Sequence, residues 1–180
     1  MVLWASRTGE QDRYALLCRC CGLKELPPVA CTAEGKPYFP QLPGVHFNLS
    51  HSGPLLLCGG GSRPVGVDIE VIRPRRGRLA EYVLSPAELA WFRARGERWG
   101  DFYTLWTLKE SRVKQAGTGL RVSPREIGVP LLEPGQIGAL DGLAFASYGG
   151  VDWRAAACTD SGELLPSQIL WEKEEKSGHL

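Results

Sequence analysis

The 180-residue chain is close to neutral, with 21 Lys and Arg against 20 Asp and Glu and a formal net charge of +1. This balance disfavours a dedicated nucleic-acid or membrane-surface protein, in which an excess of basic residues usually forms a stripe or a tail. The length suits one compact domain or two small lobes that share a core.

The first residues, MVLWASRTGEQDR, contain no apolar run long enough for a secretory signal, and no segment approaches the roughly 20 apolar residues that span a bilayer. A cytoplasmic protein is therefore expected. The six cysteines lie among apolar neighbours, as reduced and buried cysteines do, rather than in a disulfide framework. Cys18 and Cys21 have a Cys-x-x-Cys spacing, but no second pair or histidine accompanies them, so a zinc site is disfavoured.

The first part of the chain predicts one helix followed by strands. Residues 11–22 carry apolar side chains at helical spacing and end in a glycine, a plausible C-cap. In VHFNLS, residues 45–50, apolar and polar residues alternate with the period of a strand. PLLLCGG and PVGVDIEV, residues 54–60 and 64–71, predict two more strands joined by a Gly-rich turn. A small lobe of helix and sheet is therefore expected over residues 1–74.

After an Arg/Pro/Gly linker over residues 75–84, two helices are predicted. LSPAELAWFRAR has a serine N-cap, a proline at the first helical position and a glutamate at the capping-box spacing. DFYTLWTLKESRVKQAG predicts a longer helix capped by Asp101 and closed by Gly117. LAFASYGGVDWRAAACT predicts a hairpin that completes a second lobe over residues 85–171. Residues 172–180 are expected to form a charged, frayed tail.

Two carboxylates share one face of the strand VGVDIEV, because successive side chains of a strand alternate between its faces. An isolated pair such as Asp68 and Glu70 is most often the solvated face of an edge strand. It is also a set of the oxygen ligands that Mg²⁺ prefers, and a third acid elsewhere favours a metal site. The long helix offers Glu110 at the edge of its apolar arc, with Lys114 one turn beyond. As an ordinary surface ion pair, these two would stabilise the helix by only ~0.2–0.5 kcal/mol.

Lys109 lies inside the apolar arc of the same helix, where a charged residue is costly unless its ammonium finds an anion. A second polar group, at the point where a strand leaves the sheet, consists of Asn48, Ser50, His51 and Ser52 in FNLSHSG. Hydroxyls, an imidazole and a backbone turn can donate several hydrogen bonds to one phosphate. They can also satisfy backbone partners, and from these residues alone that structural role is favoured.

The order and spacing of these pieces resemble the 4'-phosphopantetheinyl transferases of the surfactin-synthetase type. The resemblance rests on GKPYFP, FNLSHSG, PVGVDIE and FYTLWTLKESRVKQAGTGL together, and it covers Asp12 to Leu120 with a weak extension to WRAAACT. Members of that family move the phosphopantetheine arm of coenzyme A onto a serine hydroxyl of a carrier protein and release adenosine 3',5'-bisphosphate. The implied fold is α+β, with two similar lobes related by a pseudo-twofold and the site in the cleft between them.

The resemblance also implies a role for each polar residue of the strand and the long helix. Asp68, Glu70 and Glu110 would hold Mg²⁺ against the pyrophosphate of coenzyme A. Lys114 would face the phosphate under attack, as would Lys109 if its side chain bends back. Glu110 is in addition the candidate base for the carrier serine, directly or through a metal-bound water.

The remaining implied contacts concern coenzyme A and its acceptor. By the same resemblance, Ser50 and His51 bind the coenzyme A phosphates, and Lys36 with Pro37 lines the nucleotide pocket. The expected partners are Mg²⁺, coenzyme A and an acyl or peptidyl carrier protein. No nucleic acid or membrane partner is expected, and the protein is expected to be a monomer.

One part of the family pattern is missing. Relatives of this type begin earlier, and their basic N-terminal segment contacts the 3'-phosphate of coenzyme A; here only Arg7 and Arg13 are nearby, so a weaker contact is expected. Two alternatives stay open: a coenzyme A-binding or regulatory protein that is catalytically weak, and an unrelated Mg²⁺-dependent phosphodiesterase. The phosphodiesterase is disfavoured because the sequence has no second acidic cluster for a two-metal site.

Overall fold

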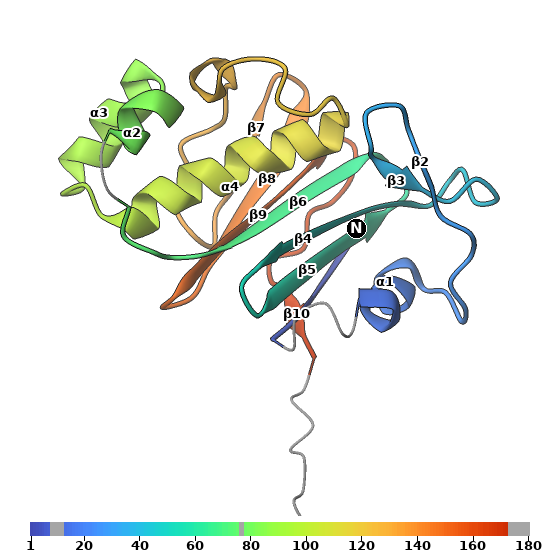
Figure 1. Ribbon diagram of the computed structural model, residues 1–180. Helices are drawn as coiled ribbons and strands as arrows, with labels where there is room; N and C mark the ends of the chain where they lie inside the picture. The colour runs from blue at the N-terminus through green and yellow to red at the C-terminus, as the bar shows by residue number, and fades with distance from the viewer. Residues whose placement is uncertain (8–12, 76–77, 173–180) are drawn as a thin grey trace, which may run out of the picture.

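The computed structural model describes residues 1–7, 13–75 and 78–172. Its strands are β1 (Val2–Ser6), β2 (Ala30–Cys31), β3 (Pro37–Tyr38), β4 (His46–Ser52), β5 (Leu55–Gly61), β6 (Val65–Val71), β7 (Ile137–Leu140), β8 (Leu143–Gly149), β9 (Trp153–Asp160) and β10 (Leu170–Trp171). Its helices are α1 (Arg13–Cys21), α2 (Leu79–Val83), α3 (Pro86–Ala94) and α4 (Trp99–Ala116), with a 3₁₀ helix at Pro124–Glu126. Helices packed on largely antiparallel sheets (Figure 1) confirm the predicted α+β class.

Two four-stranded sheets face each other across a shared core, with strand orders β10-β1-β5-β4 and β6-β9-β8-β7. The core between them contains Leu55 and Leu57 of the first sheet together with Val67 and Ile69 of the second. The helix α1 packs on the outer face of the first sheet and α4 on the outer face of the second (Figure 1). Each four-stranded sheet thus carries one main helix on its outer face.

The predicted boundaries between the lobes differ from the observed sheets. Residues 65–71 are expected in the first lobe, whereas β6 pairs antiparallel with β9 over its whole length and so belongs to the second sheet. The short β10, expected in the second lobe, pairs with β1 of the first. The expected linker contains α2. These pairings join segments far apart in the chain, and local sequence patterns do not specify them.

The ends of the chain also carry structure that the sequence patterns do not indicate. Residues 2–6, to which no element is assigned above, form β1 and pair with β5. Glu172, expected in the tail, donates its backbone N–H to the carbonyl of Ala5 at 2.8 Å. The rest of the expected tail, residues 173–180, lies outside the described residues.

The predicted start of α3 is confirmed, and that of α4 is wrong. The Ser85 hydroxyl accepts from the backbone N–H of Glu88 at 3.4 Å, and the Glu88 carboxylate accepts from the backbone N–H of Ser85 at 2.7 Å, which completes the capping box. The helix α4 begins at Trp99 rather than with a cap at Asp101. Asp101 lies inside the first turn, where it pairs with two arginines that precede it.

The last turn of α4 ends as predicted, at Gly117, whose φ of 69° lies in the left-handed region that favours glycine. The predicted hairpin is also confirmed, because β8 and β9 pair antiparallel.

Within residues 1–7, 13–75 and 78–172, no helix has both the length and the apolar character needed to cross a membrane.

Candidate active site

The edge strands of the two sheets, β4 and β6, run side by side and parallel (Figure 1), and side chains of β4 bridge them. Polar residues at alternate positions of β4 accept hydrogen bonds from alternate backbone N–H groups of β6, which have no strand partner on that side. We call this contact the β4–β6 seam, and it comprises Asn48 Oδ1 with Val67 N at 2.8 Å, Ser50 Oγ with Ile69 N at 3.3 Å, and Ser52 Oγ with Val71 N at 3.2 Å. The structural role favoured for FNLSHSG is therefore confirmed for three of its residues.

The hydroxyl of Ser50 is fully used by neighbouring groups of the protein. It donates to Asp68 Oδ1 at 2.7 Å and accepts from Lys114 Nζ at 3.0 Å as well as from Ile69 N at 3.3 Å. A hydroxyl has one donor and two lone pairs, so all three are engaged. The expectation that Ser50 also binds a coenzyme A phosphate stays a prediction, and in this structure the Ser50 proton points to the Asp68 carboxylate. The neighbouring His51 is exposed at the end of β4.

Asp68 is the most buried acid of the site, with 2% of its surface exposed. Burial raises the pKa of its carboxyl to about 7, although Lys114 and Ser50 oppose the shift. One oxygen, Oδ1, accepts from Ser50 and forms an ion pair with Lys114 Nζ at 2.6 Å. The other, Oδ2, is buried and has no hydrogen-bond partner among the described residues. A buried carboxylate oxygen without a donor is uncommon in folded proteins, and a bound ion or an ordered water would satisfy it.

Glu70 and Glu110 complete an acidic group around Asp68. Glu70 Oε2 accepts from the Ser52 hydroxyl at 2.7 Å, and its charge contributes to raising the pKa of Asp68. Burial raises the pKa of Glu110, which is opposed by Lys114 and reinforced by the charge of Glu70. In the part of the chain that the structure describes, however, no three His, Cys, Asp or Glu side chains converge as a ready-made metal cage.

The helix α4 reaches β6 closely enough to bring Lys114 onto Asp68 because of one glycine. A Cβ on Gly66 would overlap the carbonyl oxygen of Ser111 and the backbone nitrogen of Gln115 in α4. No other residue fits there without moving the helix, which explains the glycine of GVDIE. Sequence reasoning missed this role, since it treats the motif only as a carrier of acids.

Lys109 points away from the acids. Its ammonium forms an ion pair with Glu88 at 2.8 Å and donates to the carbonyls of Pro124 and Ile127 at 2.9 and 2.7 Å. Burial lowers the pKa of Lys109, and the hydrogen bond and charge of Glu88 oppose this shift. Five residues of an α-helix turn through roughly 140° beyond a full revolution, so Lys109 and Lys114 occupy different faces. The expectation that Lys109 faces a phosphate is therefore corrected: it joins α4 to α3 and to the segment after α4.

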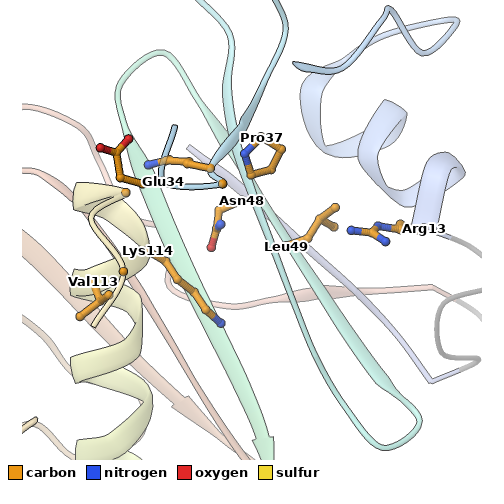
Figure 2. Close-up of a pocket in the computed structure, with 11 residues that line it drawn as sticks. Arg13, Glu34, Pro37, Asn48, Leu49, Val113 and Lys114 are labelled. Atoms are coloured by element: carbon orange, nitrogen blue, oxygen red, sulfur yellow. The ribbon is translucent and has the colours of Figure 1, made fainter. Parts of the chain in front are cut away.

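A pocket of about 290 Å³ opens beside Lys114, between the C-terminal turn of α4 and the strand β4 (Figure 2). We call it the α4–β4 pocket. Its lining residues are Arg13, Glu34, Gly35, Lys36, Pro37, Asn48, Leu49, Val113, Lys114, Gly117 and Gly119.

The walls of the α4–β4 pocket include Lys36 and Pro37, which the family resemblance assigns to a nucleotide pocket. Lys36 Nζ donates to the carbonyls of Gln115 at 2.6 Å and Val65 at 3.2 Å, so it ties this wall to the end of α4. Burial lowers its pKa. On the opposite side, the guanidinium of Arg13 extends from α1 toward Leu49 (Figure 2). The pocket thus has basic groups on several walls, and the acids lie directly beyond Lys114.

Sequence reasoning grouped Asn48 and Ser52 with the other polar residues of FNLSHSG but did not count them among the site residues. Asn48 lines the α4–β4 pocket while it holds the β4–β6 seam, and Ser52 binds Glu70. The signal was present in the alternation of polar residues along β4, at positions 48, 50 and 52. The register between β4 and β6 is what turns this alternation into contacts, and a single sequence does not contain it.

Comparison with known proteins identifies the family. A family model described as the 4'-phosphopantetheinyl transferase superfamily matches residues 64–158, the segment with Asp68, Glu70, Glu110 and Lys114. A 4'-phosphopantetheinyl transferase of Bacillus subtilis is 41% identical over 105 residues, which are 57% of this chain and 47% of the relative. The 4'-phosphopantetheinyl transferase AcpT of Salmonella typhi is 46% identical over 102 residues, 53% of this chain and 52% of the relative. The chain spans about half the length of the curated relatives it matches. The matched segment covers more than half of the chain, which therefore belongs to the 4'-phosphopantetheinyl transferase superfamily.

Proposed function

We propose that this protein transfers the 4'-phosphopantetheine arm of coenzyme A to a serine hydroxyl of an apo acyl or peptidyl carrier protein and releases adenosine 3',5'-bisphosphate. The observation that carries the proposal is the buried Asp68, whose Oδ2 has no donor among the described residues, next to Lys114 and the α4–β4 pocket. The named activity of the relatives supports the same reaction.

The α4–β4 pocket is the proposed binding site for the nucleotide half of coenzyme A. Basic groups on its walls, Arg13 and Lys114, suit a ligand that carries phosphates, and charge-assisted contacts of this kind are among the stronger hydrogen bonds. Pro37 and Leu49 supply apolar surface for the flat base, and the exposed His51 is a candidate for an outer phosphate contact. This direction of binding brings the pyrophosphate to Lys114 and the acids.

The residues of the acidic group fit Mg²⁺. Asp68 Oδ2 is a buried oxygen with no hydrogen-bond donor in the described residues, and Glu70 and Glu110 are close enough for their charges to interact. Mg²⁺ usually takes only one or two carboxylates and fills its other positions with water and substrate phosphate, so a complete protein cage is not required. Asp68, Glu70 and Glu110 would hold it. When bound there, the ion would neutralise the negative charge that develops as the phosphoanhydride breaks.

The other chemical steps fall to side chains of α4. Glu110 takes the proton from the carrier serine, and a carboxylate whose pKa is raised by burial is a better base near neutral pH. The serine oxygen forms a bond to the phosphorus next to the pantetheine arm, and the bond from that phosphorus to the bridging oxygen breaks. The Lys114 ammonium stabilises the phosphate oxygens, and the Ser50 hydroxyl holds that ammonium next to Asp68.

The test is direct. The protein is incubated with coenzyme A, Mg²⁺ and an apo carrier protein, and the carrier is analysed by mass spectrometry for one added phosphopantetheine arm. The Glu110→Gln variant, which keeps the shape of the side chain but cannot act as base, serves as the matched control. Tight binding of coenzyme A without modification of either an acyl or a peptidyl carrier would favour the alternative of a coenzyme A-binding or regulatory protein.

A further inference from the structure

We infer that Ser52 is a positioning residue for the metal-binding acids, which orients the carboxylate of Glu70 for a divalent cation without touching substrate. The inference rests on the proposed function, since it assigns Glu70 to a cation. Neither the motif match nor the comparisons give Ser52 a role, and in the sequence it is one hydroxyl among several.

The geometry of Ser52 fixes the direction in which its hydroxyl proton points. Its Oγ accepts from the backbone N–H of Val71 at 3.2 Å and donates to Glu70 Oε2 at 2.7 Å. Both partners belong to consecutive residues of β6, so the strand that carries the acid also holds the group that orients it. Because the hydroxyl accepts a hydrogen bond from a backbone N–H, its own proton has few other directions available. The hydrogen bond that it donates therefore restricts the orientation of the Glu70 carboxylate.

The same arrangement occurs one step earlier along the seam. Ser50 Oγ accepts from Ile69 N at 3.3 Å and donates to Asp68 Oδ1 at 2.7 Å. The repeat follows from the two-residue period of both parallel strands. Each acid of β6 therefore has one oxygen fixed by a serine of β4. For Asp68, the other oxygen is the buried Oδ2 that lacks a donor among the described residues.

Such fixation matters because the two acids repel each other. The negative charge of Glu70 disfavours ionisation of Asp68. Without a hydrogen bond to restrain them, the two side chains would rotate so that their carboxylates lie farther apart. A hydrogen bond donated to one oxygen restricts this rotation and leaves the second oxygen for a cation. Groups that orient metal ligands in this way typically change metal affinity by roughly 10- to 100-fold when they are removed.

Ser52 gives a cleaner test than Ser50. Ser50 also bonds Lys114, so its substitution would disturb a proposed phosphate contact as well as Asp68. The hydrogen bonds described for the Ser52 hydroxyl reach only Glu70 and Val71. A matched control exists at Ser62, whose hydroxyl donates to Glu163 at 3.1 Å on the exposed turn after β5, away from the acids.

The experiment compares the full chain with Ser52→Ala, Ser52→Thr and Ser62→Ala. Mn²⁺ affinity is measured by electron paramagnetic resonance with coenzyme A present, and the Mg²⁺ dependence of carrier modification is measured in parallel. Ser52→Ala should weaken Mn²⁺ binding by about tenfold or more and raise the Mg²⁺ concentration at half-maximal rate by a similar factor. The rate at saturating Mg²⁺ should change less. Ser62→Ala should leave both unchanged, and Ser52→Thr should recover most of the loss.

A double-mutant cycle separates orientation from general stability. In a Glu70→Gln background, Ser52→Ala should no longer change Mn²⁺ affinity, because its effect passes through Glu70. An unchanged Mn²⁺ affinity in Ser52→Ala, or an equal loss with and without Glu70, overturns the inference. If the wild-type chain neither binds Mn²⁺ nor modifies a carrier, the proposed function fails instead, so the two failures are distinguishable.

Discussion

Replacing Gly66 with alanine should move α4 away from β6 without removing any polar side chain of the site. The new Cβ would lie 2.9 Å from the Gln115 Cα and would overlap the Ser111 carbonyl, whereas ordinary contacts begin near 3.4 Å. Both atoms are helix backbone, so no side chain can turn away, and α4 must move outward from β6 by about 1 Å. That shift moves Lys114 and Glu110 relative to Asp68.

The expected cost has two parts. Overpacking of a well-packed interior costs about 1–3 kcal/mol in the free energy of unfolding, which urea titration measures. Misplacement of catalytic groups by about 1 Å lowers the rate of carrier modification by roughly a hundredfold. Gly44→Ala is the control, because a Cβ at Gly44 meets nothing within 4 Å. Gly66→Ala with wild-type stability and wild-type rate would refute the tight approach of α4 to β6.

Four further changes test other parts of the structure. Ser147 has a buried hydroxyl with no partner among the described residues, so Ser147→Ala should raise the free energy of unfolding by about 1 kcal/mol; any decrease contradicts this prediction. Lys109→Met should lower the free energy of unfolding by about 3–5 kcal/mol, because the buried Glu88 carboxylate loses its ion-pair partner, and adding Glu88→Leu should restore much of that loss in urea titrations. Asp68→Asn should lower carrier modification at least about a hundredfold with circular dichroism unchanged; retention of the rate removes Asp68 from the site. Arg75 is exposed, and its Nε donates a hydrogen bond to the Tyr103 hydroxyl at 3.0 Å. Arg75→Gln should raise the KM for an acidic carrier protein severalfold at low salt and leave it unchanged at high salt. A loss of coenzyme A affinity as large as the loss of carrier affinity would exclude a carrier contact.

The elements that sequence reasoning predicted correctly depend on residues close together in the chain. The capping box of Ser85 and Glu88 and the left-handed Gly117 are local, and both are observed. The shared face of Asp68 and Glu70 follows from strand alternation alone, and both acids bond to hydroxyls of β4. Local rules are enough here because the backbone geometry within a few residues decides the outcome.

What sequence reasoning could not predict depends on partners far along the chain. The apolar arc of α4 indicated that Lys109 needs an anion, but not that the anion is Glu88 of α3. The sequence also predicted that Asp101 caps α4, whereas its carboxylate forms ion pairs with Arg95 and Arg98. The assignment of β6 to the second sheet depends on β9, which lies more than eighty residues later in the sequence. In each case the sequence pattern indicated that a partner is needed, and the tertiary structure determines which residue is that partner.

The position of the site at the β4–β6 seam follows from the hydrogen-bonding needs of two sheet edges. Backbone N–H groups on a buried edge must find acceptors, and side chains of β4 provide them where a direct ladder is absent. A serine that accepts from the backbone still has a proton to donate, and the adjacent acids of β6 receive it. An apolar residue at these positions of β4 would leave those acids without a hydroxyl donor. The seam thus closes the two sheets and orients the carboxylates beside the α4–β4 pocket with the same hydroxyls.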